Sequence, residues 1–222
     1  NLRLLAGKTL IEHAFDCAIH CGDITDIVCA SDSAEILRCA NDYFSKSTAE
    51  INTYAIKLPE WLTLDNSLLT PVTRYCIDRL ELETSAATIG TIALIQPTSP
   101  LRHETDLSKA LSLHKTTGKD VVSVSLIPST LEKLLYVDES GCIQKLTSKD
   151  TQLSQQGTKI FRQNGAVYVV SRKRVFNKET WVDSDCIAYE MPAARGIDID
   201  TEGDLRLAEV MLHQSVSQEE AQ

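Results

Sequence analysis

The sequence predicts an α/β fold in which helices flank a mostly parallel β-sheet. Helical and strand patterns alternate along the chain, an order that is typical of parallel sheets. The expected strands are continuous apolar runs, as in strands that are buried on both faces. With 222 residues, 43% of them hydrophobic, the chain can bury one sizeable core. We therefore expect a single domain over residues 1–222, with an excursion from the sheet over residues 128–164.

The first half of the chain predicts three helices and two strands. An apolar stripe runs from Leu10 to Ile19 at helical spacing and stops at Gly22, which indicates the first helix. Pro71 is compatible with the first turn of a later helix. The expected elements are a strand over 26–30, a helix through 40 that is capped within 31–33, a helix over 68–82 and a strand over 88–95.

The second half predicts a hairpin, two more strands and two more helices. The hairpin is expected over 134–145, where the pattern alternates around the turn sequence Asp138-Glu139-Ser140-Gly141. The polar segment 147–158 is interpreted as a lid or as a partner-binding arm outside the main sheet. The other expected elements are a helix over 106–114, strands over 120–126 and 165–170, a closing helix over 203–213 and a frayed tail over 215–222.

Charge and cysteine content narrow the class of protein. The formal net charge of −9 argues against a nucleic-acid partner, although a nucleotide can still bind locally through Mg²⁺ and a few basic side chains. Seven cysteines form an odd set without a CxxC pair, which indicates reduced core thiols in a cytoplasmic protein. No apolar run approaches the roughly 20 residues that span a bilayer, so we expect no membrane partner.

Two polar motifs carry the chemistry. The segment 96–102 directly follows a predicted strand, and α/β enzymes present ligand-binding groups on loops at such strand ends. Asp198 and Asp200 stand at i and i+2, so in an extended chain they project from the same side and can meet one divalent cation. The alternative for this pair is a solvated turn with a helix-capping aspartate. Together the two motifs suggest metal-assisted chemistry on a phosphorylated substrate.

Five sequence blocks, in the same order and at matching intervals, resemble one known family. The blocks are Asn1-Leu2 with Ala6-Gly7-Lys8, Ala30-Ser31-Asp32, residues 96–102, residues 161–168 and residues 197–202. They resemble the CMP-sugar synthetases that activate nonulosonic acids, typified by acylneuraminate cytidylyltransferase. The resemblance implies a Rossmann-like nucleotidyltransferase fold with a dimerisation excursion, a homodimer and dependence on Mg²⁺. It further implies transfer of CMP from CTP to the anomeric hydroxyl of a sialic-type sugar acid, with release of pyrophosphate.

The resemblance also implies roles for the metal and sugar sites. Asp198 and Asp200 match the family's metal carboxylates, which we expect to be the catalytic groups. Gln96 matches a glutamine that hydrogen-bonds the sugar acid. Arg162 and Asn164 match the family pattern at the substrate, where the arginine either neutralises an anionic group or forms a structural ion pair.

Four more positions have both a functional and a structural interpretation. Asn1 aligns with the end of the family's nucleotide loop and is expected to contact the nucleotide. Asp32 either orients a nucleotide group or caps the following helix. Ser99 and Arg102 either bind substrate or hold the shape of their loop, which the flanking prolines also restrict.

Three departures from the family pattern bear on activity. The family's glycine- and lysine-containing nucleotide loop precedes the position of Asn1, so we expect that loop to be missing from this sequence. Leu58 stands before a proline, where the family has an arginine that helps to form the cytosine pocket. Ser154 aligns with an arginine that reaches the sugar carboxylate across the dimer. Lysines that could replace this charge are Lys133, Lys149 and Lys159.

Two functions of different class therefore stay open. In the first, the chain is an incompletely represented CMP-nonulosonate synthetase. In the second, it is a catalytically silent relative that serves as a binding or oligomerisation module. A cytidylyltransferase for a 3-deoxy-octulosonate is a further alternative, which the segment 96–102 disfavours.

Overall fold

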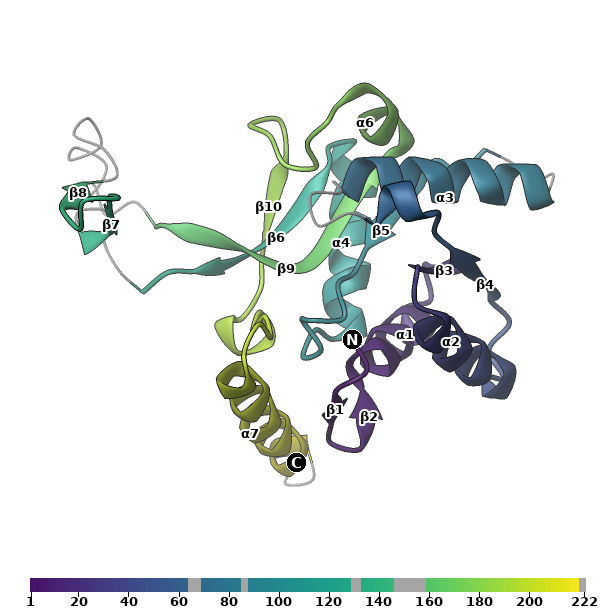
Figure 1. The fold of residues 1–222 in the computed structure, drawn as a ribbon, viewed down its shortest axis with the longest axis horizontal. Helices are drawn as coiled ribbons and strands as arrows, with labels where there is room; N and C mark the ends of the chain where they lie inside the picture. The colour runs from purple at the N-terminus through teal and green to yellow at the C-terminus, as the bar shows by residue number, and fades with distance from the viewer. Residues whose placement is uncertain (64–68, 85–87, 129–132, 146–158, 220–222) are drawn as a thin grey trace.

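A four-stranded sheet forms the centre of the fold in the computed structural model, which describes residues 1–63, 69–84, 88–128, 133–145 and 159–219 (Figure 1). The strands follow the order β10-β6-β9-β5. Their bounds are Thr91–Leu94 for β5, Val121–Leu126 for β6, Phe161–Ser171 for β9 and Ile187–Glu190 for β10. The polar segment 147–158, which was interpreted as a lid or partner-binding arm and contains Lys149 and Ser154, lies outside the described residues.

The sheet is mixed, which corrects the prediction of a mostly parallel one. β10 runs parallel to β6, whereas β9 lies between β5 and β6 and runs antiparallel to both. Alternating helices and strands predict a parallel pair only where a helix crosses over between the two strands. Between β6 and β9 the chain instead forms a hairpin of β7 (Leu135–Val137) and β8 (Ile143–Lys145), as the sequence predicts for 134–145.

Helices cover both faces of this sheet. Successive residues of a strand point to opposite faces, so each strand contributes side chains to two clusters. On one face, Val121, Val167 and Val169 form a core cluster with residues of α1 (Leu10–His20) and α4 (Glu104–Thr117). On the other face, Val122, Tyr168 and Val170 form a cluster with residues of α3 (Leu69–Thr84) and α6 (Arg172–Asn177). The result is a three-layer α/β/α arrangement.

A second, parallel pair of strands lies beside this layer. β3 (Asp26–Ser31) pairs with β4 (Asn52–Lys57), and α2 (Ala34–Lys46) connects them. The N-cap of α2 is Ser33, whose hydroxyl accepts a hydrogen bond from the backbone N–H of Ile36. The capping interpretation of Asp32 is therefore wrong, because the neighbouring serine performs that role.

The two ends of the described chain meet. A hairpin of β1 (Leu4–Leu5) and β2 (Lys8–Thr9) leads into α1, whose predicted start is fixed by a capping box between Thr9 and Glu12. The C-terminal helix α7 (Glu202–Glu219) packs on β1 through a cluster that contains Leu5 and Ala208. Figure 1 shows this helix, in yellow, alongside that hairpin and away from the four-stranded sheet. α7 also continues through residues 215–219, where a frayed tail was predicted.

Several smaller elements were not predicted. They are β4, α6, β10 and the short 3-10 helices Glu60–Leu62 and Ala193–Arg195. Of the seven free cysteines, four are buried, as the sequence indicates for most of them, and Cys142 on the β7–β8 hairpin is exposed. None of the helices in the described residues is long and apolar enough to cross a membrane.

Candidate active site

The candidate site is built around a bulge in β9. Val122 of β6 pairs with Tyr168, whereas Val124 pairs with Gln163, so four residues of β9 stand opposite a single residue of β6. Gly165 lies inside this bulge with φ = 74°, a backbone conformation that side chains disfavour. Bulges of this kind interrupt a ladder and redirect side chains, which makes them common beside functional sites.

Asn164 holds the bulge in place from the protein interior. Its side chain is 2% exposed, and its Oδ1 accepts hydrogen bonds from Ser123 Oγ at 2.5 Å and from Ala166 N at 3.1 Å. Its Nδ2 donates to Ser125 Oγ at 3.0 Å. These bonds replace the missing strand ladder, since buried polar groups need partners. The structure thus places Asn164 behind the site surface, where it shapes the site.

Gly165 marks the point at which the two predicted motifs converge. A Cβ atom at this position would lie 2.6 Å from Gln96 Oε1, and 3.6 Å from both Ser99 Oγ and Asp198 Oδ2. A side chain there would push the end of the Gln96 side chain aside, and the positive φ also favours glycine. Residues from three distant parts of the sequence, the loop after β5, the bulge of β9 and the segment before α7, therefore share one small volume.

The loop after β5 is fastened to the bulge. Ser99 is fully buried, and its hydroxyl donates to the carbonyl of Asn164 at 3.2 Å. Arg102 is 5% exposed, and its Nη1 donates to the carbonyls of Gln96 at 2.7 Å and Ala166 at 3.0 Å. Of the two interpretations of Ser99 and Arg102, these contacts support the structural one.

A backbone hydrogen bond joins the segment with the two aspartates to the same loop. The backbone N–H of Ile199 donates to the carbonyl of Thr98 at 2.8 Å. Asp198 is half-buried, and its Oδ1 is a buried atom that finds no hydrogen-bond partner among the described residues. Asp200 is exposed, and its backbone N–H donates to Asp204. The carboxylate of Asp198 is therefore available to an additional ligand.

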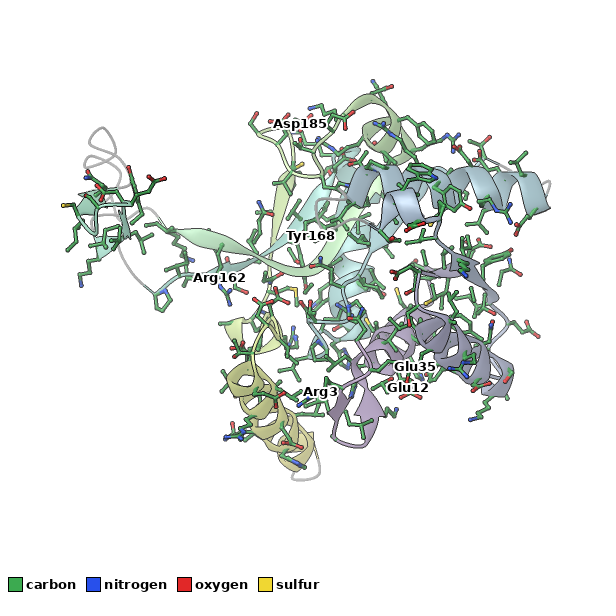
Figure 2. All side chains as sticks on the ribbon, in the orientation of Figure 1. Arg3, Glu12, Glu35, Arg162, Tyr168 and Asp185 are labelled. Carbon is green, nitrogen blue, oxygen red and sulfur yellow. The ribbon has the colours of Figure 1, made fainter. Side chains whose placement is uncertain are left out.

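Two side chains of β9 flank the aspartate segment. Arg162 is exposed, and its Nη2 donates to the carbonyl of Gly196 at 3.5 Å. Tyr168 is 9% exposed, and burial, with a further contribution from the Asp198 carboxylate, raises its pKa. Figure 2 shows Arg162 on the part of β9 that extends from the sheet and Tyr168 nearer the sheet centre. Apart from its place in the block 161–168, Tyr168 was not singled out by any sequence pattern.

Three sequence-predicted positions lie elsewhere. Asn1 is exposed, and its carbonyl accepts from the backbone N–H of Ile11 in the first turn of α1. Asp32 is exposed in the turn between β3 and α2. Among the described residues, no hydrogen bond joins Asn1 or Asp32 to the residues around Gly165. Leu58 is partly buried against the apolar cluster that contains Cys76.

The carboxylates suit a hard cation that brings most of its own ligands. No group of three or more His, Cys, Asp and Glu side chains converges within the part of the chain that the structure describes. Mg²⁺ is commonly held by one or two carboxylates and completes its shell with water and substrate phosphates. The partnerless Oδ1 of Asp198 fits such an ion. A structural zinc site needs more ligands than these residues offer.

Known proteins resemble this chain over most of its length. A sequence model of the family described as Cytidylyltransferase matches residues 1–181. CMP-N,N'-diacetyllegionaminic acid synthase of Legionella pneumophila is 30% identical over 215 residues, which cover 96% of this chain and 88% of that protein. N-acylneuraminate cytidylyltransferase of Streptococcus agalactiae is 23% identical over 208 residues, which cover 92% of this chain but only 47% of that protein.

A solved structure shares the fold over most of both chains. It is CMP:2-keto-3-deoxy-manno-octonic acid synthetase complexed with CTP, with a TM-score of 0.68, 12% identity and coverage of 96% of this chain and 91% of the other. At this identity the likeness supports the α/β fold alone. The family model that matches residues 1–181 and the relative with 30% identity show that this chain belongs to the cytidylyltransferase family, and the shared fold agrees with that membership.

Proposed function

We propose that the protein transfers CMP from CTP to a nonulosonic, sialic-type sugar acid and releases pyrophosphate. The observation that carries this proposal is the convergence of Gln96 and Asp198 on Gly165. An amide that can both donate and accept suits the hydroxyls of a sugar, and a free carboxylate oxygen suits a metal ion that also binds phosphate. The names of the relatives from Legionella and Streptococcus favour the same class of substrate.

The reaction is a nucleotidyl transfer in which positioning and charge neutralisation supply most of the catalysis. The anomeric hydroxyl oxygen of the sugar acid forms a bond to the α-phosphorus of CTP. The bond between that phosphorus and the bridging oxygen to the β-phosphate breaks, so pyrophosphate leaves with the bonding electrons. The proton of the hydroxyl is lost to solvent. The protein must therefore hold the sugar and the triphosphate in line.

Asp198 and Asp200 would hold Mg²⁺ through their carboxylates. When bound, the ion would neutralise the charge that develops on the phosphates. Gln96 would hold the sugar acid, and the exposed guanidinium of Arg162 would pair with its carboxylate or with a phosphate. These groups act on a surface that the buried side chains around the bulge keep rigid.

The remaining predicted site residues divide by position. Ser99, Arg102 and Asn164 would support the substrate from behind, since all three are buried. Asn1 and Asp32 would contact the nucleotide from the turns next to α1 and α2. Each of these two residues is exposed and therefore accessible to a ligand.

A homodimer formed through the β7–β8 hairpin is part of this proposal. Figure 1 shows the hairpin projecting away from the sheet, at the left of the view. Its exposed fractions are 48% for Leu135, 52% for Tyr136, 60% for Val137 and 68% for Ile143. Contiguous apolar side chains at a projecting tip favour burial against another chain. The seven free cysteines favour a reducing, cytoplasmic location.

A catalytically silent module is the second candidate, and Leu58 favours it. This side chain packs into an apolar cluster and has no group that donates to a nucleobase. If it occupies the family's cytosine pocket, the affinity for CTP falls.

Pyrophosphate release tests the proposal. The assay uses CTP, Mg²⁺ and a panel of nonulosonic acids with the 222-residue chain. We expect release with at least one sugar acid, and loss of release in the Asp198→Asn variant. Silence of the folded protein with every sugar would favour the silent module.

A further inference from the structure

Asp106 is the most completely enclosed carboxylate near the site, and no role described above uses it. It lies in the first turn of α4 and is 0% exposed. Its Oδ2 accepts from the backbone N–H of His103 at 3.0 Å and from Arg195 Nε at 2.8 Å. Its Oδ1 accepts from Arg195 Nη2 at 2.8 Å and from the Tyr189 hydroxyl at 2.9 Å.

These four bonds connect the two motifs that form the site. His103 directly follows Arg102, the last residue of the loop that begins at Gln96. Arg195 stands three residues before Asp198 in the segment that leads to the metal carboxylates. The two motifs also meet directly, through the bond from Ile199 N–H to the Thr98 carbonyl. Asp106 adds a bidentate ion pair with Arg195 to this backbone hydrogen bond.

The chemistry of the connection exceeds what a helix cap requires. In the capping box of α4, Asp106 only has to accept the backbone N–H of the N-cap His103, which an uncharged side chain can also do. A buried charge is costly unless its lone pairs are satisfied. Burial tends to raise the pKa of Asp106, but the hydrogen bonds from Arg195, His103 and Tyr189 outweigh it and lower the pKa. The residue is therefore an anion at neutral pH, paired with a guanidinium fork that fixes direction as well as distance.

We propose that Asp106 is a positioning residue that, through Arg195, sets the place of the Asp198 segment relative to the sugar-binding loop. This inference rests on the proposed function, because it concerns the metal and sugar sites of that reaction. Loss of the fork would free the segment before Asp198 while leaving the fold and the chemical groups of the site intact. A residue that hydrogen-bonds a metal ligand typically contributes about 10-fold to 100-fold in metal affinity or activity, and Asp106, which acts through Arg195, should lie at the lower end of that range.

The test measures Mn²⁺ binding, with the ion as a spectroscopic substitute for Mg²⁺. Free Mn²⁺ is followed by electron paramagnetic resonance in the presence of CTP, for the wild type and for D106N, R195K and E104Q. E104Q is the matched control, since Glu104 lies in the same turn of α4 and, among the described residues, forms its ion pair with His103. R195K keeps the charge but not the fork, and its side chain is 37% exposed, so it tolerates substitution better than Asp106.

We expect D106N and R195K each to weaken Mn²⁺ binding about 10-fold, with E104Q unchanged. The D106N/R195K double variant should bind Mn²⁺ no more weakly than the more affected single variant, because both substitutions break the same connection. In turnover, kcat should fall by a similar factor while KM for the sugar acid changes by less than about 3-fold.

Two results would overturn the inference. One is that folded D106N and R195K bind Mn²⁺ as tightly as the wild type, even if their melting temperatures fall. Asp106 would then have a purely structural role. The other is wild-type protein that binds no Mn²⁺ with CTP. A wild type that binds Mn²⁺ but forms no CMP-sugar would instead contradict the proposed function and leave the binding comparison decisive for Asp106.

Discussion

Two ion pairs near the central sheet each have a buried partner, one pair beside the candidate site and one at the α6 end of the sheet. At the site, Asp106 binds Arg195 and joins two loops. At the other, Asp120 binds Arg174, which also binds Asp185. Figure 2 shows Asp185 near α6, at the top of the view. The chemistry is the same, but the first pair includes Arg195, three residues before Asp198, whereas the second joins α6 to the residues that precede β6 and β10.

This comparison shows that an ion pair takes its role from what it connects. Arg174 is 5% exposed and lies in the first turn of α6, and Asp120 also accepts from the backbone N–H of Ser171 at 2.7 Å. Burial tends to lower the pKa of Arg174, but Asp120 and Asp185 outweigh it and raise it. We expect substitutions of this cluster to change stability, and those around Gly165 to change activity.

Asp198→Asn should give the largest effect on activity. The substitution keeps the size of the side chain but removes the charge that would hold Mg²⁺. Turnover should fall by more than the roughly 100-fold that loss of a second-sphere partner can cost. The assay is pyrophosphate release at saturating CTP. Asp183→Asn is the control at the α6 end, and equal losses in both variants would refute the metal assignment.

Asp120→Asn should give the largest effect on stability. It leaves the buried guanidinium of Arg174 with a weaker partner, and breaking such a pair costs about 3 kcal/mol or more. Urea unfolding measures this change. The activity of each folded molecule should stay near that of the wild type. If activity falls more than stability explains, the two ends of the sheet are coupled and the comparison fails.

Gly165→Ala and Gly118→Ala form a matched pair that sharpens the contrast. Both glycines have positive φ, 74° and 65°, so each substitution should cost about 1 kcal/mol in backbone strain. A Cβ at Gly118 meets no atom within 4 Å, whereas one at Gly165 would displace the Gln96 amide. Only Gly165→Ala should raise KM for the sugar acid. Equal kinetic effects would show that the bulge does not shape the sugar site.

The smallest expected effect is a pH dependence at the α6 end. Lys178 and Arg174 lower the pKa of Asp185 to about 2 from an ordinary value of 3.8. Since the folded pKa is lower, the ionised carboxylate stabilises the fold above pH 3.8, and this contribution is lost as the pH falls towards about 2. The melting temperature of Asp185→Asn should therefore fall less than that of the wild type over that range. Parallel curves would contradict the assignment.

Local sequence patterns predicted the elements that are stabilised by contacts within their own segment. The stripe from Leu10 to Ile19 and the capping pair Thr9 and Glu12 lie within one segment, so α1 was predictable. β4 was missed because Asn52, Thr53 and Lys57 interrupt its apolar run, and its stability depends on pairing with β3. The antiparallel direction of β9 depends on contacts with β5 and β6, which no local pattern encodes.

The candidate site shows the same limit. Gln96 and Asp198 were predictable because strand ends and an i, i+2 carboxylate pair are local signals, and the fold brings both to Gly165. Asn164 was taken for a substrate ligand, but its bonds to Ser123 and Ser125 depend on a bulge that only the three-dimensional structure reveals. Asp106 was missed because its significance lies in Arg195, 89 positions further along the chain.

Steady-state kinetics of Gln96→Ala test the central claim most directly, namely that the β9 bulge gathers a sugar-binding group beside a metal-binding one. Pyrophosphate release is measured with CTP and the sugar acid varied in turn. The account predicts a KM for the sugar acid raised at least about 10-fold, as loss of a good hydrogen-bonding group costs about 1.4 kcal/mol or more, with KM for CTP unchanged. Unchanged KM for every accepted sugar acid, in a variant that folds normally, would contradict it.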